Sequence, residues 1–151
     1  MNPKERAIEL MGIWIASVID GMDEFVDEET KIRVLESCGK ACAAFHGHLQ
    51  IVADLKAKGS SVEDILTHMN REKMWCGDWI QEGDIISSIC DACECPLVLA
   101  DLVKLSPTFC YCSRGFAKSL FEEILGKPVS VELTKAIGRG DEFCHFRVDC
   151  H

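Results

Sequence analysis

The sequence lacks any concentration of basic residues. Its 16 lysines and arginines stand against 25 aspartates and glutamates, which gives a formal net charge of −9. A charge of this sign repels phosphate backbones and anionic lipid surfaces unless a local basic patch offsets it. No such patch is present, so nucleic acid is excluded as an expected partner.

The sequence also has no hydrophobic run that could cross a membrane. The apolar segment near the N-terminus is interrupted by Gly12 and has no small-residue cleavage site, which excludes a signal peptide and a membrane anchor. Internal repeats, low-complexity tracts and long linkers are absent. We therefore expect one domain, residues 1–151, located in the cytoplasm and without a membrane partner.

The motifs of the common nucleotide-binding and hydrolytic sites are missing as well. There is no P-loop, dinucleotide-binding glycine pattern, G-x-S-x-G elbow or H-E-x-x-H helix. What the sequence has in quantity is cysteine, with ten residues. In a reducing compartment, clustered cysteines indicate metal binding or catalysis more often than disulfides, although free cysteine also packs as a small buried hydrophobe.

Residues 1–72 are expected to be mainly helical. Asn2 and Pro3 begin a helix that runs to about Gly21, and a second helix covers about 28–46 and stops at Gly47. Ser60 and Glu63 have the spacing of a capping box for a third, short helix. We place His48, directly after Gly47, in an exposed loop.

Residues 73–151 are expected to mix strands with one helix. The segment "DIISSICDACEC" predicts a strand that Pro96 ends, and "TFCYC" predicts a second extended segment. A helix then begins at Ser113 and ends at Gly126, before a hairpin formed by "VSVELTKAI" and "EFCHFRV". The fold class is α+β, with N-terminal helices packed on an antiparallel sheet and one helix inserted between C-terminal strands.

Two C-x-C pairs predict a soft-metal site. Residues i and i+2 of a strand face the same side, so Cys93 and Cys95 share one face and Cys110 and Cys112 share another. If these strands pair, four thiols converge at a separation that suits zinc. Zinc and iron are the candidate metals, although structural zinc sites more often use C-x2-C spacing.

A second group of candidates lies on the helix expected at 28–46. Cys38, Cys42 and His46 follow one another at four-residue intervals, so they form a ridge that is either core packing or a ligand or catalytic site. Cys38 and Cys42 are further candidate metal ligands, and Cys42, Cys112 and His46 are candidate catalytic residues. Trp75 and Trp79 either fill the core or stack on a ligand in a small pocket.

The C-terminal part of the chain resembles the closing segment of the 4-vinyl reductase domain superfamily. The shared features are the C-x-C-S-x-G stretch at 110–115, the Gly-Lys-Pro-Val step at 126–129 and the Gly-Asp-x-x-Cys-x-Phe hairpin at 140–146, with a weaker match in "ESCGKACA" at 36–43. The resemblance is closest to the branch labelled L-2-amino-thiazoline-4-carboxylic acid hydrolase-like.

This resemblance implies a sensor-like α+β fold that encloses a small-molecule pocket. Some sensor relatives bind zinc through an upstream cysteine and an E-x2-C-x7-C hairpin. Here Cys144 matches the last ligand of that hairpin, whereas Leu133 and Ala136 stand at the other two positions and Glu132 is one residue away. The hydrolase label implies ring opening of a thiazoline by activated water or a thiol.

The leading hypothesis is a cysteine-rich, small-molecule-binding domain, with zinc or iron held by thiolates as an accompanying feature. The expected partners are a small hydrophobic or heterocyclic ligand and a second copy in a homodimer. One alternative is a hydrolase that opens a C–N or C–S bond of an amino-thiazoline carboxylate. Another is a redox-sensing or scaffolding subunit.

Overall fold

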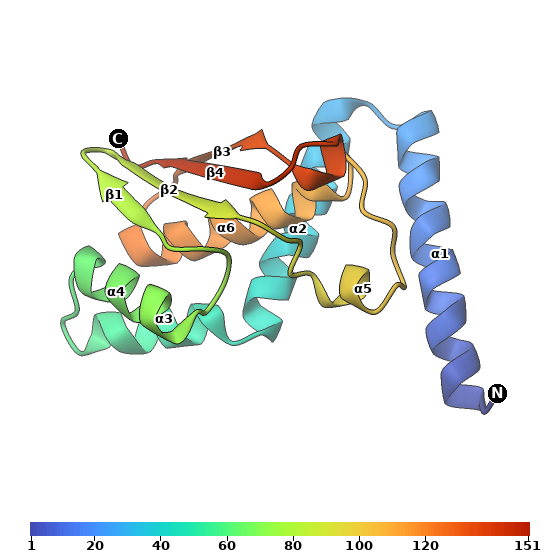
Figure 1. Cartoon of the computed structure of the whole chain (residues 1–151), viewed down its shortest axis with the longest axis horizontal. Coiled ribbons are helices and arrows are strands. Elements are labelled where there is room, and N and C mark those ends of the chain that lie inside the picture. Colours follow the sequence, from blue (N-terminus) through green and yellow to red (C-terminus); the bar gives the residue numbers. More distant parts are fainter.

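A computed structural model describes residues 1–151 as a group of helices followed by a mixed region (Figure 1). This arrangement confirms the α+β class. In chain order the elements are α1 (Pro3–Phe25), α2 (Glu28–Phe45), α3 (His48–Ala57), α4 (Val62–Glu72), β1 (Ile80–Glu82), β2 (Ile85–Cys90), α5 (Pro96–Leu99), α6 (Cys110–Leu125), β3 (Ser130–Lys135), the 3-10 helix η1 (Ile137–Arg139) and β4 (Cys144–Asp149).

The first two helices begin where the sequence predicts. The Asn2 side chain accepts a hydrogen bond from the Glu5 backbone N–H while the Glu5 carboxylate accepts one from the Asn2 N–H, which is a complete capping box ahead of α1. Helix α1 continues one turn beyond Gly21, to Phe25. Asp27 caps α2 through the backbone N–H of Thr30.

Helix α3 was not expected, and the prediction for His48 was wrong. Gly47 ends α2 with φ of 78°, a left-handed conformation that glycine adopts without steric cost, and the chain enters α3 at the next residue. His48 is therefore a half-buried helical residue and not part of an exposed loop. Helix α4 is capped by Ser61 with Asp64, one position after the predicted pair.

The four strands form an antiparallel sheet in the order β1-β2-β4-β3. The predicted C-terminal hairpin is confirmed, with Val131 opposite Val148 and Leu133 opposite Phe146. Phe146 and Val148 are buried, while Arg147 between them is exposed, as the alternation of residue types predicts. The apolar face of this sheet packs against α6 to form the main core.

Helix α6 is the central helix, lying between the sheet and α2 (Figure 1). Phe116, Leu120 and Phe121 on α6 are all buried in the main core. On its other side the backbone of α6 approaches α2 closely at two glycines: a Cβ atom at Gly39 would overlap the carbonyl oxygen of Cys112, and one at Gly115 would overlap the backbone of Glu36. Both positions therefore require glycine for the helices to pack at this distance.

The start of α6 corrects two predictions. The segment "TFCYC" is not extended, and Ser113 lies inside the helix and does not cap it. The chain turns into the helix at Ser106 and Pro107, because the Ser106 hydroxyl accepts a hydrogen bond from the Phe109 N–H at 3.2 Å and its carbonyl accepts one from the Cys110 N–H. Serine followed by proline is a helix-start pattern, and it outweighs the local alternation of residue types.

Candidate ligand-binding site

A cavity of about 190 Å³ lies between the α2–α3 junction, the start of α6 and the inner face of the sheet. Its walls are largely apolar. Aromatic rings form one side: the Trp75 ring centre lies 4.4 Å from that of Phe116 and 5.0 Å from that of Phe146. These three rings come from the loop after α4, from α6 and from β4, so the tertiary fold brings the wall together.

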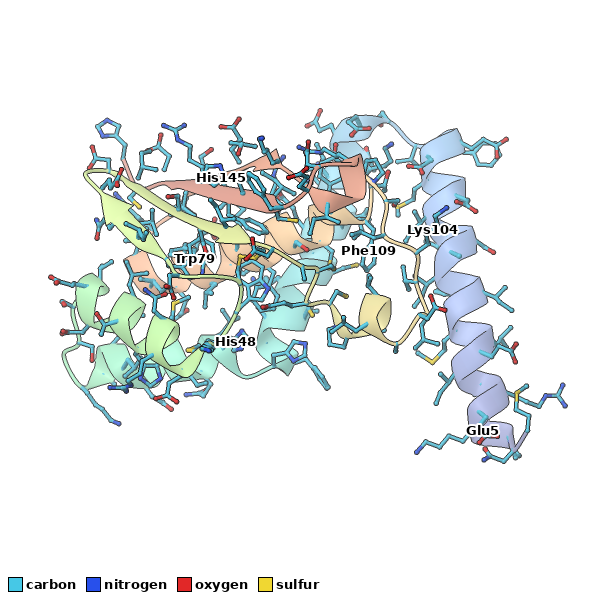
Figure 2. The ribbon with its side chains drawn as sticks, viewed as in Figure 1. Glu5, His48, Trp79, Lys104, Phe109 and His145 are labelled. Atoms are coloured by element: carbon cyan, nitrogen blue, oxygen red, sulfur yellow. A yellow bond between two sulfur atoms is a disulfide. The ribbon has the colours of Figure 1, made fainter.

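Two histidines, His46 and His48, line this cavity, and one of them has an unpartnered buried nitrogen. His48 lines the cavity from the first turn of α3 (Figure 2), and its Nδ1 is buried without a hydrogen-bond partner. Burial, with a smaller contribution from His46, lowers the pKa of His48, so the ring is neutral near pH 7. A buried polar atom without a partner carries a free-energy cost that a bound ligand can relieve.

Seven of the ten cysteines line the same cavity, namely Cys42, Cys90, Cys93, Cys95, Cys110, Cys112 and Cys144. Burial raises the pKa of Cys110 to about 11 and that of Cys112 to about 12, and it also raises the pKa values of Cys42 and Cys93. Protonated thiols are weakly polar and make favourable contacts with aromatic rings. These thiols therefore make their part of the wall neutral and polarizable, and Glu94 is the one carboxylate in the lining.

The C-x-C pairs do not lie on paired strands as predicted. Cys93 and Cys95 lie in the loop between β2 and α5, and Cys110 and Cys112 lie in the first turn of α6. Residues two apart on a helix point to different sides, in contrast to residues two apart on a strand. The Cys110 thiol accordingly lies near Gly138, Cys144 and Cys93, whereas Cys112 lies near Cys38, Cys42 and Cys95.

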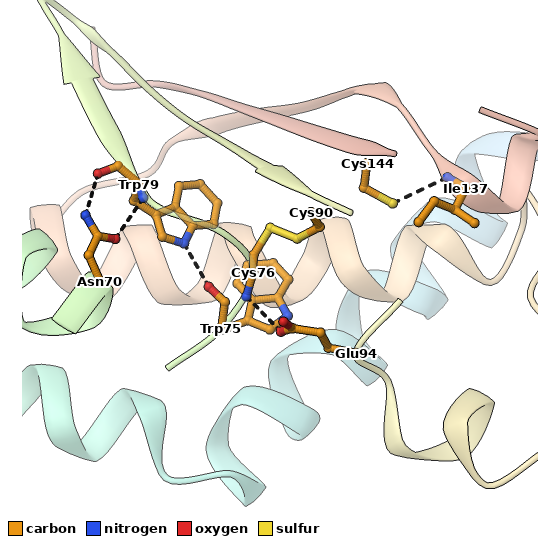
Figure 3. The surroundings of a disulfide bond; sticks show 8 residues. All are labelled: Asn70, Trp75, Cys76, Trp79, Cys90, Glu94, Ile137 and Cys144. Atoms are coloured by element: carbon orange, nitrogen blue, oxygen red, sulfur yellow. Dashed lines mark hydrogen bonds between the residues drawn. A yellow bond between two sulfur atoms is a disulfide. The ribbon is translucent and has the colours of Figure 1, made fainter. Parts of the chain in front are cut away.

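No group of three or more histidine, cysteine, aspartate or glutamate side chains has an arrangement that could hold a metal ion. The thiols have other partners in several places. Cys76 and Cys90 form a disulfide, which corrects the expectation that the cysteines are reduced, and Cys144 Sγ accepts a hydrogen bond from the Ile137 N–H at 3.4 Å (Figure 3). Metal ligation by the predicted cysteines thus stays a prediction.

The disulfide belongs to a hydrogen-bonded frame that fixes the aromatic wall (Figure 3). The Cys76 N–H donates to the Glu94 carboxylate at 2.8 Å, and the Trp79 indole N–H donates to the Trp75 carbonyl at 3.0 Å. The Asn70 side chain on α4 holds the backbone of Trp79 with two hydrogen bonds. Its amide N–H donates to the Trp79 carbonyl, and its Oδ1 accepts from the Trp79 backbone N–H. Trp79 is only 2% exposed and belongs to the core, so of the two predicted ligand-stacking tryptophans only Trp75 lines the cavity.

A larger hollow of about 540 Å³ lies between α2 and α6 but has a different character. It is open to solvent, and Val34 is its one hydrophobic residue. Within it, Glu36 pairs with Arg114 at 3.0 Å and with Lys118 at 3.7 Å, so much of its charge is already neutralised. The smaller apolar cavity is the better candidate for a ligand.

Residues 3–151 match the profile DUF6144, described as a family of unknown function. The chain belongs to the DUF6144 family. Comparison with curated proteins finds no match. None of the helices in this DUF6144 protein combines the length and hydropathy needed to cross a bilayer.

Two solved structures share the fold of this DUF6144 chain. The phenol-responsive sensory domain of the transcription activator PoxR, solved with phenol, matches with a TM-score of 0.58 and 12% identity over 94% of this chain and 73% of the other. Trafficking protein particle complex subunit 3 from Naegleria fowleri, covalently bound to palmitic acid, matches with a TM-score of 0.51 and 17% identity over 96% and 95% of the two chains. At these identities the likeness establishes the fold.

Most of the predicted site residues of the DUF6144 chain meet at the cavity. They are brought together by helices and loops, and not by the pairing of two strands that the sequence predicted. Cys42, His46, Trp75 and the four C-x-C cysteines all line it, whereas Cys38 and Trp79 do not. Sequence reasoning missed the lining residues His48, Phe116, Phe146 and Cys144 as members of one site. The "HGH" sequence was the available signal for His48, because a glycine between two histidines can turn the chain and return the second one to the same pocket.

Proposed function

We propose that the cavity binds a small, neutral, single-ring aromatic or heterocyclic ligand that carries a hydrogen-bonding group, and that the domain acts as a sensor of that ligand. The observation that carries the proposal is the unpartnered Nδ1 of His48, a residue that lines a cavity walled by aromatic rings and thiols. A ligand hydroxyl, which can donate or accept, pairs with this nitrogen in either tautomer of the neutral imidazole, while the ring of the ligand contacts Trp75 and Phe116.

The volume of the cavity supports a ligand of this size. An engineered apolar cavity of about 150 Å³ binds benzene, and the cavity here measures about 190 Å³. A single substituted ring fits this space, whereas a long acyl chain such as the palmitic acid of the trafficking-complex neighbour does not. The phenol-responsive sensory neighbour, whose fold the chain shares, supports the same ligand class.

The charges around the cavity favour a neutral ligand over a carboxylate. The lining contains one carboxylate, Glu94, and neither lysine nor arginine. An amino-thiazoline carboxylate would therefore lose its hydration without gaining a cationic partner. Burial also raises the pKa values of Cys42 and Cys112, the opposite of the shift that activates a thiol nucleophile. These observations favour binding over the hydrolase alternative and leave the catalytic assignments as predictions.

The resemblance to the 4-vinyl reductase superfamily agrees with this proposal, since the sensor relatives of that superfamily enclose small-molecule pockets. It remains a resemblance carried by the motifs at 110–115, 126–129 and 140–146. The accompanying proposal, zinc or iron bound by thiolates, is supported by the number of cysteines that line the cavity. The arrangement of the side chains does not add support, because no three of them are placed to hold a metal ion.

The test is calorimetric titration of the full chain with phenol, toluene, benzoate and 2-amino-thiazoline-4-carboxylate. We expect phenol and toluene to bind and the two carboxylates to bind much more weakly. His48→Phe removes the hydrogen-bonding nitrogen and keeps a ring, so it should weaken phenol binding about tenfold, the effect of one lost hydrogen bond, and leave toluene binding nearly unchanged.

The matched control is His68→Phe, because His68 is a half-buried histidine, like His48, but lies on α4 outside the cavity. It should bind both ligands like the unmodified chain. The proposal fails if none of the aromatic compounds binds, or if His48→Phe and His68→Phe affect phenol binding equally. Release of a ring-opened product from the amino-thiazoline carboxylate, abolished by Cys112→Ala, would instead establish the hydrolase.

A further inference from the structure

Helix α1 exposes apolar side chains that the rest of the chain leaves uncovered. It stands beside the body of the molecule, and its N-terminal half, where Glu5 is labelled, extends beyond the body (Figures 1 and 2). Leu10 is 63% exposed, Met11 58% and Trp14 67%. Isolated exposed hydrophobic residues are common, but a contiguous apolar group on one helix marks an interaction surface.

A different side of α1 already packs against the body. Gly12 and Ile19 are buried, and a Cβ atom at Gly12 would lie 2.8 Å from the Leu102 carbonyl oxygen. Ile15 and Ile19 contact the second hydrophobic cluster, which includes Val103 and Phe109. The apolar residues on the remaining surface of α1 are therefore not part of the fold of a single chain.

Some of the exposed apolar residues form a row along the helix, while Ile8, Met11 and Ile13 are exposed outside it. Leu10, Trp14 and Val18 follow one another at four-residue intervals, so their side chains lie next to each other on one side. Ala7 and Phe25 extend the row toward the two ends of the helix. We define these five residues as the α1 ridge. A ridge of this kind is the surface that packs into the groove of another helix.

The charges of α1 argue against a lipid surface as the occupant. Helices that lie on membranes are rich in lysine and arginine on their polar face. In α1 the only basic residues are Lys4 and Arg6, near the N-terminus, and the last turn contains no basic residue. Asp20, Asp23 and Glu24 make the C-terminal end acidic, which repels anionic lipids.

We propose that the α1 ridge pairs with the α1 ridge of a second copy of this chain, with the two helices antiparallel and centred on Trp14. The observation that selects this occupant is the charge asymmetry of the helix. In an antiparallel pair the N-terminal half of each helix, where Lys4 and Arg6 balance Glu5 and Glu9, meets the acidic end of the other, whereas a parallel pair would place the acidic ends against each other.

The spacing of the charged residues matches this arrangement. Arg6 and Glu24 are eighteen residues apart, which is five helical turns, so both lie on the same side of α1. Both are exposed, and neither forms an ion pair within its own chain. Antiparallel pairing about Trp14 brings Leu10 of one copy against Val18 of the other and Arg6 of one copy close to Glu24 of the other. The two-fold symmetry of the pair produces two copies of this Arg6–Glu24 contact.

The first experiment is sedimentation equilibrium of the full chain and of Trp14→Glu. We expect a dimer for the unmodified chain. Trp14 meets its own copy at the centre of the pair, so a glutamate there removes an anchoring aromatic residue and places two like charges together, which should weaken dimerisation at least about thirtyfold. Leu99→Glu, which changes an exposed leucine on α5, is the matched control and should remain dimeric.

A charge exchange tests the orientation of the helices. Arg6→Glu alone should weaken the dimer by placing two acidic residues together, and adding Glu24→Arg in the same chain should restore it, because every contact then contains one residue of each sign. A parallel pair would show no such rescue. Circular dichroism and the melting temperature check that the variants fold, as expected for substitutions at exposed positions.

Three results would overturn the proposal. The first is a monomer at the highest soluble concentration. The second is a dimer that Trp14→Glu leaves intact, which would place the interface elsewhere. The third is a monomer that binds vesicles of phosphatidylcholine with phosphatidylglycerol through α1, which would make lipid the occupant of the ridge.

Discussion

At the scale of single residues, the environment of each thiol decides its chemistry more than its place in a motif. The C-x-C cysteines were expected to act as thiolates, but Cys110 and Cys112 are enclosed by α2, α6 and the hairpin. Burial raises their pKa values to about 11 and about 12. Such a thiol is neutral near pH 7 and serves as part of the cavity wall, because its charged form would be poorly solvated.

This environment has a measurable consequence for alkylation. We expect iodoacetamide near pH 7 to modify the exposed Cys38 quickly and Cys112 slowly, because the thiolate is the reactive form and the raised pKa and burial both suppress it. Peptide mass spectrometry over a time course gives both rates. Equal rates for Cys38 and Cys112 would contradict the assignment of Cys112 as a neutral wall thiol.

The raised pKa values of Cys110 and Cys112 also determine whether these thiols make the fold more or less stable as pH rises. An unfolded thiol has a pKa near 8.5, and Cys110 and Cys112 have higher values when folded. Between the unfolded and the folded pKa of each thiol, the folded state therefore binds more protons than the unfolded state. The free energy of unfolding falls as pH rises through that range. These thiols leave stability unchanged at pH 6–8 and reduce it progressively above about pH 9.

At the scale of elements, the contact of α2 with α6 is the most constrained in the molecule. Gly39 and Gly115 face the backbone of the opposite helix without room for a methyl group. This packing fixes Cys42, on α2, beside Cys112, on α6, and so sets one wall of the cavity. The single glycine in each of the stretches "ESCGKACA" and "CYCSRGF" is thus required by helix packing, in addition to being part of the sequence resemblance.

We expect Gly39→Ala and Gly115→Ala each to lower the free energy of unfolding by roughly 1–3 kcal/mol, the usual effect of overpacking. The matched control is Gly21→Ala. Gly21 also lies in a helix but has open space around it, so alanine there should raise stability by about 0.5–1 kcal/mol. Urea unfolding measures all three, and a neutral effect at Gly39 would show that the helices separate at little cost.

Element prediction succeeded where local signals were complete and failed where a distant contact decided. The capping residue Asn2, the left-handed Gly126 and the alternating hairpin are local, and each led to the observed element. By contrast, "TFCYC" alternates like a strand yet begins α6, because Ser106 and Pro107 start the helix and Cys110 is then buried against the hairpin.

At the scale of the whole molecule, the Cys76–Cys90 disulfide links the loop after α4 to the end of β2. Cys90 also pairs with Cys144 across the β2–β4 ladder, so the bond ties the aromatic wall to the centre of the sheet. Trp75 directly precedes Cys76, so we expect the position of this cavity ring to depend on the redox state of the bond. The adjacency of Trp75 to the disulfide is the observation that favours the redox-sensing alternative.

We expect reduction of this disulfide to lower the free energy of unfolding by about 3 kcal/mol, because a closed loop of this length restricts the unfolded chain by about that amount. Phenol binding should weaken at the same time, as the loop that carries Trp75 gains freedom. Guanidinium unfolding and calorimetry with and without a phosphine reductant measure both effects.

The double variant Cys76→Ala/Cys90→Ala provides the control for this experiment, because it should resemble the reduced protein and show no further response to the reductant. If the unmodified chain keeps its stability and its phenol affinity after complete reduction, the disulfide neither stabilises the fold nor positions Trp75.

The sequence by itself determined the α+β class, the starts of α1 and α2, the end of α6 and the C-terminal hairpin, because capping, glycine conformation and side-chain alternation act between residues close in the chain. It also indicated that the cysteines, His46 and Trp75 belong to a site. Only the tertiary structure decided what that site is, because the roles of His48, Cys112 and Trp75 depend on burial and on neighbours far away in sequence. The packing of α2, α6 and the sheet turned an expected thiolate cluster into a neutral, aromatic-walled cavity.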